Sequence, residues 1–229
     1  MTPDGLLGLL QFADGLFPAG GFAHSLGLET YAQAGLVRDR AGLEAFLVAH
    51  LEGSAGPTDA VAVAVAARHA AAEDLVGCLA LDALGRIQQC VGEFREASRQ
   101  MGRQAARVAA AVTDDRFVDA LAGAVAEGRT AGHHPVVFGA VTRRAGADPE
   151  SAAAAYLYAT VAQLTGAALR LLPLGQLEAQ RALAAMRPRI RRLAAEAARG
   201  RAEDMWSFTP GLEIAGWRHA RLEARLFRS

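Results

Sequence analysis

The residues that could do chemistry gather near the start of the chain, in the segment LFPAGGFAHSLGLETYAQAG, which covers residues 16–35. Two adjacent glycines, Gly20 and Gly21, precede His24, Ser25 and Glu29. Residues of these types could form a phosphate-binding loop, a metal site or a catalytic group. They could also mark the start of a helix that docks another protein. The spacing of the residues decides among these alternatives.

A phosphate-binding or hydrolytic site does not fit this spacing. A dinucleotide-binding loop needs the pattern GxGxxG between a strand and a helix, whereas these glycines are adjacent and follow a helical pattern. The chain has no lysine, so the P-loop pattern fails as well. His24 directly precedes Ser25, and neighbouring side chains point apart, which places His24 badly as a base for Ser25. We therefore expect Ser25 to cap a helix that runs to about Ala34.

A metal site is not predicted either, because a metal ion needs two to four ligands held in a fixed geometry. The six histidines are mostly solitary: His24, His50, His69, His133, His134 and His219. The adjacent pair among them would point about 100° apart on a helix, which suits one site poorly. Cys78 and Cys90 form no CxxC pair and are typical of core cysteines in a reducing compartment. We expect no metal site and no cofactor.

Arginine supplies all of the Lys and Arg content, in a chain of zero formal net charge. The basic region over residues 187–201 has few aromatic neighbours, which favours a solvated helix face over nucleic-acid binding. A second group, Arg218, Arg221, Arg225 and Arg228, would fall within about 80° on an ideal helix. This row is either a docking strip or a charged face neutralised by nearby glutamates. The sequence leaves both interpretations open.

The composition predicts an all-α fold, because alanine is the best helix former and runs of β-branched or aromatic residues are scarce. We expect one domain over residues 1–229, a bundle of roughly nine to eleven helices around a buried central helix, with a flexible segment at 203–229. The expected helices cover 4–14, 25–34, Asp39 to Gly53, a helix with Pro57 in its first turn, 75–112 with its glycines leaving breaks open, 115–128, 135–146, 149–172, 176–186, 189–199 and 213–227.

The central helix is the apolar segment from Ala152 to Leu172. It is long enough to cross a bilayer, yet much of its bulk is alanine and it carries Gln163 and Arg170. A helix that is apolar nearly all round also suits the centre of a soluble bundle. No charged-then-apolar leader opens the chain. We expect a cytoplasmic protein with no membrane segment.

Four collinear segments carry a resemblance to a known family. They are LLQFADGLFPAGGFAHSLGLETYAQAGLV, HHPVVFGAV, YLYATVAQLTGAALRLLPLGQLEAQRALAAM and SFTPGLEIAGWRHARLEARLFRS. Together they resemble the UreF family of urease accessory proteins, from near residue 6 to the last residue. The resemblance implies an all-α, dimer-forming protein without catalytic activity. Its implied partners are UreD (also called UreH), the GTPase UreG and the urease apoprotein, to which nickel is delivered.

The resemblance also assigns residues to roles. The implied partner-binding residues are Phe17, Pro18, Gly20, Gly21, Phe22, His24, Ser25, Glu29, Tyr31, Gln176, Arg181, His219, Arg225, Leu226 and Phe227, and the implied dimerisation residues are Tyr156 and Tyr158. Phe22 stands where many relatives have tyrosine, so an aromatic packing role is implied there rather than a hydroxyl role. In relatives the C-terminal segment becomes ordered when UreD binds, which suits a strip that cannot bury itself alone.

Two other classes of function stay open at this point. A helical enzyme with a scattered site would need His133, Glu29 and Arg170 to converge in a closed pocket. A helical ligand-binding or regulatory module would need a roomy apolar cavity in place of a packed alanine-rich core.

Overall fold

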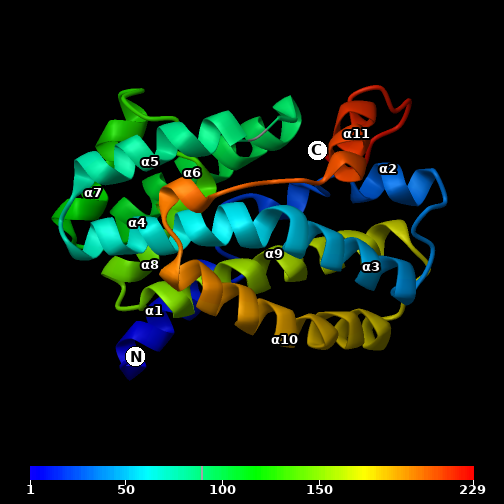
Figure 1. The fold of residues 1–229 in the computed structure, drawn as a ribbon, viewed down its shortest axis with the longest axis horizontal. Helices are drawn as coiled ribbons and strands as arrows, with labels where there is room; N and C mark the ends of the chain where they lie inside the picture. The colour runs from blue at the N-terminus through cyan, green and yellow to red at the C-terminus, as the bar shows by residue number, and fades with distance from the viewer. Residues whose placement is uncertain (89) are drawn as a thin grey trace.

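The computed structural model describes residues 1–88 and 90–229, which form eleven α-helices and no strand (Figure 1). The helices are α1 (Pro3–Ala13), α2 (Leu28–Gln33), α3 (Arg40–His50), α4 (Val61–Ala71), α5 (Leu75–Gln88), α6 (Gly92–Val112), α7 (Arg116–Ala126), α8 (His134–Arg144), α9 (Pro149–Leu171), α10 (Gln176–Arg199) and α11 (Pro210–His219). Three shorter elements are η1 (Gly21–Ala23), η2 (Leu51–Ala60) and η3 (Ala202–Asp204). The all-α prediction is confirmed.

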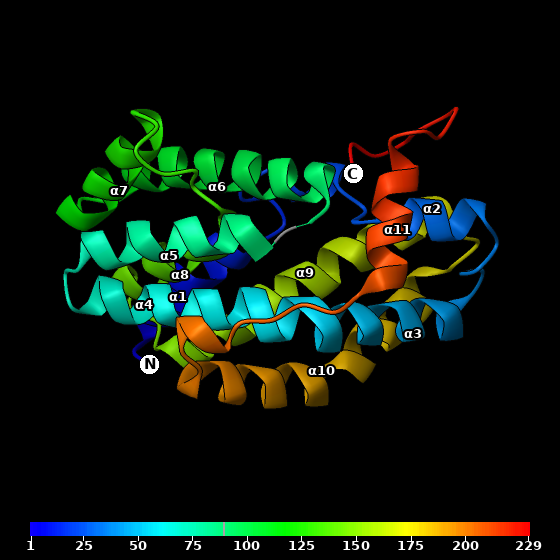
Figure 2. The ribbon, with the colours of Figure 1, turned by 45° about the horizontal axis from the view of Figure 1, so that its top comes forward.

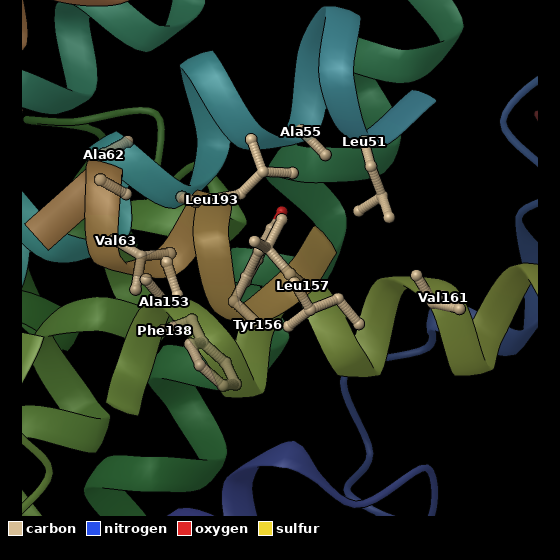
Figure 3. Close-up of a cluster of buried hydrophobic side chains, with 14 of the residues drawn as sticks. Leu51, Ala55, Ala62, Val63, Phe138, Ala153, Tyr156, Leu157, Val161 and Leu193 are labelled. Atoms are coloured by element: carbon tan, nitrogen blue, oxygen red, sulfur yellow. The ribbon is translucent and has the colours of Figure 1, made fainter. Parts of the chain in front are cut away.

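Helix α9 is the centre of the bundle, with α10, α4 and α8 packed around it. The Asp148 carboxylate accepts the Ser151 N–H at 2.8 Å, and Pro149 occupies the first turn, so the helix begins where the sequence predicts. Leu157 and Val161 are fully buried in the core that Figure 3 shows. Helix α9 is long and apolar enough to span a membrane, but half of its most apolar stretch is buried inside the protein. That burial is typical of a core helix in a soluble bundle.

Helices α3 and α4 are joined without a break by η2, a π-helix, into one rod that runs along the molecule (Figure 1). The predictions that a helix ends near Gly53 and that Pro57 begins a new one are therefore wrong. In an α-helix the ring of Pro57 would collide with the carbonyl of Gly53, four residues earlier. The wider π-helical turns avoid this collision and leave that carbonyl oxygen free for another donor.

The donor comes from an extended segment, residues 205–209, that lies along the rod (Figure 2). The Phe208 N–H donates to the Gly53 carbonyl at 2.8 Å, and the Trp206 N–H donates to that of Pro57 at 3.4 Å. In return the Thr58 hydroxyl donates to the Trp206 carbonyl at 2.5 Å. Both aromatic side chains stay exposed. The π-helix thus fixes the path by which the chain leaves α10 and reaches α11.

Helix α10 continues through Pro188, so the expected division into two helices is wrong. Pro188 lies on the exposed side of the helix. Proline has no N–H, so the backbone carbonyl four residues earlier lacks its helical hydrogen bond, and on this side it can be hydrated instead. Buried residues on both sides of the proline, among them Met186 and Ile190, pack on the core and hold the two halves in line. Packing of this apolar face outweighs the local cost of the proline.

The last helix, α11, ends at His219 rather than near Phe227. The chain then turns back and crosses beside α2, which packs against α11 (Figures 1 and 2). The arginine row expected on one helix face therefore does not exist, because Arg221, Arg225 and Arg228 lie beyond the helix end.

Close packing of α8 on α4 gives a direct test of this fold. A Cβ atom on Gly139 would collide with the backbone carbonyl of Val63, whereas nothing lies within 4 Å of the same position on Gly123. We expect Gly139→Ala to destabilise the protein by about 2 kcal/mol or more, since a backbone clash cannot relax easily. Gly123→Ala, in the helix α7, should stabilise it by about 0.5 kcal/mol. Urea unfolding of the two variants measures both effects.

Candidate functional site

The N-terminal segment and the C-terminal segment, far apart in the sequence, meet beside α2 and α11. We call the contact of residues 20–29 with residues 219–229 the terminal junction. It is built largely from hydrogen bonds to backbone groups, and its polar core is a buried carboxylate.

That carboxylate belongs to Glu29, whose side chain is only 2% exposed. One oxygen accepts from the His219 ring Nε2 at 2.9 Å and from the Phe227 N–H at 3.1 Å. The other accepts from the Leu226 N–H at 2.7 Å. Burial by itself raises the pKa of Glu29, but the hydrogen bonds from Leu226, His219 and Phe227 lower it below the usual value. Glu29 is therefore anionic at neutral pH and ties the tail to α2.

His219 joins Glu29 to a second carboxylate, that of Glu93 at the start of α6. The imidazole is fully buried, and its Nδ1 lies 2.9 Å from Glu93. Each ring nitrogen of His219 therefore faces an oxygen of one glutamate side chain. Arg225 adds a bond to the other oxygen of Glu93 at 3.1 Å. The side chains of Glu29, His219, Glu93 and Arg225 thus form one continuous chain of polar contacts across the junction.

The loop before α2 binds the end of the tail. The N–H groups of Ser25 and Leu26 donate to the backbone oxygen of Ser229 at 2.6 and 3.1 Å, and the Ser25 hydroxyl donates to it at 2.9 Å. His24 Nδ1 lies 2.9 Å from the Ser229 hydroxyl, and burial together with the nearby charge of Arg228 lowers the pKa of His24. The glycine-containing loop before α2 therefore binds an oxygen of its own chain.

The expected helix start at Ser25 is wrong by three residues. Helix α2 begins at Leu28, after Gly27 with a left-handed φ of 90°. The Ser25 hydroxyl still lies 3.4 Å from the Glu29 N–H, but its main acceptor is Ser229. Leu26, with a φ of 50°, and Gly27 both have left-handed backbone, and glycine adopts this conformation at little cost.

Two side chains of helix α9 contact the loop before α2 and the C-terminal tail. The Gln163 amide donates to the His24 carbonyl at 3.0 Å, and Arg170 donates to the Phe22 carbonyl at 3.1 Å. The Arg170 guanidinium also lies 4.4 Å from the centre of the buried Phe227 ring, a cation–π contact. The Phe22 side chain points outward with 73% of its surface exposed. The side chains left for a partner at this junction are therefore exposed aromatic, aliphatic and arginine groups.

The other residues in the predicted partner set divide between this region and a separate one. Phe17 and Pro18 lie just before the loop, with Phe17 packed edge-on against Phe12, and the Tyr31 ring packs on Phe46. Gln176 and Arg181 lie exposed on the first turns of α10, where Arg181 binds Glu178 at 2.7 Å. Gln176 and Arg181 are thus not among the groups that form the terminal junction.

The two tyrosines predicted for dimerisation lie in different surroundings. Tyr156 is buried in the core, where Figure 3 shows its ring pointing from α9 towards the rod. Its hydroxyl donates to Asp59 at 3.4 Å. Tyr158 is 42% exposed on the outer side of α9. In this fold only Tyr158 presents a surface to a second copy, and the dimer itself stays a prediction.

The scattered enzyme site does not assemble. Glu29 binds the tail, Arg170 binds the loop carbonyl of Phe22, and His133 lies against Ser98 at the start of α8. The three groups have separate partners. Among the described residues, no group of three His, Cys, Asp or Glu side chains is arranged so that it could hold a metal ion.

Beside the junction lies a cleft of about 420 Å³ that three helical faces share. Its lining includes His50, Ser54, Thr58 and Asp59 of the rod, Phe94, Ala97, Ser98 and Met101 of α6, and Tyr156, Ala159, Thr160, Gln163, Gly166, Ala167 and Arg170 of α9. In a fully packed bundle such faces would touch one another. This part of the molecule therefore has the kind of space that a ligand-binding module would need.

One wall of the cleft carries three ionisable groups, Asp59, His50 and His134, that have no ion pair among the described residues. Burial raises the pKa of Asp59 to about 7, although the bond from Tyr156 acts in the other direction. Burial lowers the pKa of His50 and of His134 to about 4. The His50 Nε2 atom is buried without a hydrogen-bond partner among the described residues. Near pH 6 this wall is therefore polar but uncharged.

Sequence reasoning missed Glu93 and Ser229, two residues on which the junction depends. In the sequence Glu93 is an ordinary acidic residue in the first turn of a helix, where the helix dipole favours carboxylates in any case. Ser229 lies in a segment that carries the family resemblance, but no role is assigned to it there. No pattern in the sequence pointed to the contacts of either residue, because their partners lie more than a hundred residues away.

The comparisons with known proteins agree with the resemblance. Residues 37–187 match the family described as UreF. A urease accessory protein UreF of Paenarthrobacter aurescens (strain TC1) is 36% identical over 223 residues, covering 97% of each chain. One of Trichodesmium erythraeum (strain IMS101) is 34% identical over 96% of this chain and 95% of its own length. One of Geobacillus kaustophilus (strain HTA426) is 32% identical over the full length of both. The chain belongs to the UreF family.

Membership sets the class of function, because the relatives are named urease accessory proteins. The chain is thus an accessory protein and not an enzyme. Both segments of the terminal junction lie outside the matched range of residues 37–187. The relatives nonetheless match this UreF protein over nearly its whole length.

The raised pKa of the partly buried Asp59 predicts a pH dependence of stability. Its folded pKa of about 7 exceeds the ordinary 3.8, so the folded state holds a proton that the unfolded state has released. Stability is therefore lost as pH rises from 4 towards 7, by at most about 1.4 kcal/mol per pH unit. We expect Asp59→Asn to be more stable than wild type at pH 8, measured by urea unfolding from pH 5 to 8.

The histidines in the cleft change the stability with pH in the opposite direction to Asp59. Their contribution must be distinguished from that of Asp59. His50 and His134 have lowered pKa values, so their contribution rises with pH between about 4 and 6.5. The difference between wild type and Asp59→Asn cancels this shared contribution. If that difference is the same at pH 5 and pH 8, Asp59 does not titrate as a buried acid.

Proposed function

We propose that this UreF protein works in the cytoplasm as a docking component of nickel-urease maturation. In this proposal it binds UreD (UreH) and, with it, recruits or modulates the GTPase UreG, so that nickel reaches the urease apoprotein. It acts as a homodimer in which Tyr158 lies at the contact between copies. The observation that carries the proposal is the terminal junction, where the two segments that resemble partner-binding elements meet.

The junction has the composition expected of a docking surface. Arg225, Leu226 and Phe22 project from backbone that is fixed by buried groups, and Phe22 and Leu226 are 73% and 52% exposed. Arginine and large apolar groups, aromatics above all, are favoured at the centres of protein interfaces. The groups beneath them are buried and satisfied, which fits a surface that binds rather than a site that reacts. Trp217 on α11, the helix that leads into the tail, is also exposed.

Substitution of the exposed residues tests this proposal. We expect Phe22→Ala and Arg225→Ala each to weaken binding of purified UreD by about tenfold or more, as is typical of interface hot spots. Neither change should alter unfolding by more than about 0.5 kcal/mol, since Phe22 is exposed and Arg225 makes a single, partly exposed ion pair. Titration calorimetry or biolayer interferometry with purified UreD gives the affinity.

Two matched controls belong to this experiment. Arg201→Ala removes an arginine whose side chain is 72% exposed, outside the junction, and Val76→Ala trims a 78% exposed apolar residue on α5. Both should bind UreD as wild type does. Binding by Phe22→Ala and Arg225→Ala that equals the wild type would show that the junction is not the UreD surface.

The cleft supports a second candidate function, a ligand-binding regulatory module. A volume of about 420 Å³ lies within the range of small-molecule sites. The walls are mostly apolar and aromatic, and the deep end carries the unpartnered His50 Nε2 and the Asp59 carboxyl. Such a division into an apolar body and a few convergent polar groups is typical of ligand pockets.

Filling the cleft tests this second function. Ala159 lines the cleft, so Ala159→Trp should occupy much of its volume. We expect the folded protein to enhance the fluorescence of the apolar dye anilinonaphthalene sulfonate, and Ala159→Trp to lose most of that enhancement. Ala184→Trp, on the exposed side of α10, serves as the control. Equal enhancement by both variants would show that the dye does not enter the cleft.

A further inference from the structure

The cleft beside the junction is lined by hydrogen-bonding groups as well as by apolar ones. Four of these groups are His50 and Asp59 of the rod, His134 of α8 and Tyr156 of α9. The Tyr156 hydroxyl donates to Asp59, but the Nε2 atom of His50 is buried without a partner among the described residues. Cavities that stay empty in proteins are apolar, whereas polar groups in a cavity wall need partners. The lining therefore favours an occupied cleft.

Most of the lining is nevertheless apolar. Phe94 and Met101 of α6 and Ala159 of α9 line the cleft, as does Phe138, whose ring packs edge-on against that of Tyr156 with 5.4 Å between the ring centres (Figure 3). Water would supply partners for the polar groups but would leave this apolar surface wet, which is unfavourable. A ligand with an apolar body covers the surface and turns one end to the polar groups.

The charge of the lining limits the charge of such a ligand. Arg170 is the one arginine among the described lining residues, and it already donates to the Phe22 carbonyl. Burial lowers the pKa of His50 and of His134 to about 4, so both imidazoles are uncharged at pH 6 and an anion would find little compensation. Burial raises the pKa of Asp59 to about 7, so its carboxyl is mostly protonated at pH 6 and offers a cation little counter-charge. An uncharged ligand avoids both costs.

The polar end of the ligand has to match a neutral imidazole. One nitrogen of a neutral imidazole donates and the other accepts, and the tautomer decides which. A hydroxyl group both donates and accepts, so it satisfies His50 in either tautomer. A hydroxyl also matches the protonated Asp59 carboxyl and the Ser54 hydroxyl, which line the same cleft. A hydroxyl end therefore fits this part of the lining without a charge.

We propose that the cleft binds a small uncharged molecule with an apolar body and a hydroxyl end, and that the hydroxyl end bonds to His50. This inference rests on the second candidate function, the ligand-binding module, and names the class of its ligand. Residues in the segment 207–213 also contribute to the lining. The proposed contacts, however, are all with the rod, α6, α8 and α9, so they do not require an ordered C-terminal tail.

Displacement of an uncharged dye tests the charge of the ligand. The dye is N-phenyl-1-naphthylamine, which fluoresces more strongly in apolar surroundings. The competitors share one naphthalene skeleton: the alcohol 1-naphthalenemethanol, the cation of 1-naphthalenemethylamine, and the anion 1-naphthoate. At pH 6 we expect the alcohol to bind about tenfold or more tightly than either ion, because a charge without a partner is costly to bury. Anilinonaphthalene sulfonate, the charged derivative of the dye, should bind more weakly than the dye itself.

A second pair of ligands tests the bond to His50. The ligand 1-ethylnaphthalene has a methyl group in place of the hydroxyl of the alcohol, and in a purely apolar site it would bind more tightly. We expect the wild type to bind the alcohol at least as tightly as 1-ethylnaphthalene. His50→Phe should shift the ratio of the two affinities about tenfold towards 1-ethylnaphthalene, since the ligand loses a hydrogen bond to a buried group.

The ratio is measured for two ligands on the same variant, so a general loss of stability in His50→Phe cancels. The matched control is His69→Phe, because His69 is outside the cleft lining and pairs with Asp74. This variant should keep the wild-type ratio. An unchanged ratio in His50→Phe overturns the proposal, and so does tighter binding of either naphthalene ion than of the alcohol.

These outcomes are distinct from a failure of the ligand-binding function. If Ala159→Trp and Ala184→Trp bind N-phenyl-1-naphthylamine equally well, the dye is not in the cleft and the ligand-binding function itself fails. If Ala159→Trp alone loses the dye but the ions displace it from the wild type as well as the alcohol does, the cleft is a ligand site and the uncharged class is refuted. Loss of the dye in Ala159→Trp together with preference for the alcohol supports both.

Discussion

The burial of the Glu29 carboxylate is the constraint on which the rest of the site depends. A carboxylate removed from water is costly unless several donors replace the lost hydration. Here every donor comes from the C-terminal tail: the His219 ring and the N–H groups of Leu226 and Phe227. The tail must therefore leave its helix at His219, since backbone groups committed to a helix could not reach Glu29. The irregular course of the last ten residues follows from this requirement.

The π-helical segment η2 also provides hydrogen-bond partners for the C-terminal part of the chain, before α11 begins. The wide turns around Pro57 leave the carbonyls of Gly53 and Pro57 open to donors from the extended residues 205–209. Residues 205–229 are then tied to the body at the rod, at Glu29 and at the Ser25 loop, mostly through backbone groups. Only α11 within this span has regular hydrogen bonding of its own. Hydrogen bonds to residues that are distant in the sequence take the place of regular secondary structure. They allow this polar, irregular segment to lie on the packed bundle.

This division explains which parts of the structure the sequence could predict. Helix starts with a local mechanism, such as the caps at Asp39, Asp115 and Asp148, were predicted correctly because the signal and the effect lie within three residues. The interpretations of Pro57 and Pro188 as helix boundaries failed, because packing and wider turns outweighed a local penalty that the sequence alone makes visible. The resemblance identified both halves of the junction. Nothing in the sequence showed that Glu29 faces His219, or that Glu93 joins them, since those contacts exist only in the folded chain.

The motif residues at the junction are of two kinds, buried and exposed. Ser25, Glu29 and His219 are buried, with their polar groups satisfied inside the chain, so a partner could reach them only by displacing the tail. Phe22 and Leu226 are exposed and can contact a partner as they stand. In the proposed docking function, substitution at the buried residues therefore acts on the placement of the tail, and on binding only through it. In the same proposal the exposed residues act on association directly. Residues of the same motif thus differ in physical role, and the difference is set by which of them the tail covers.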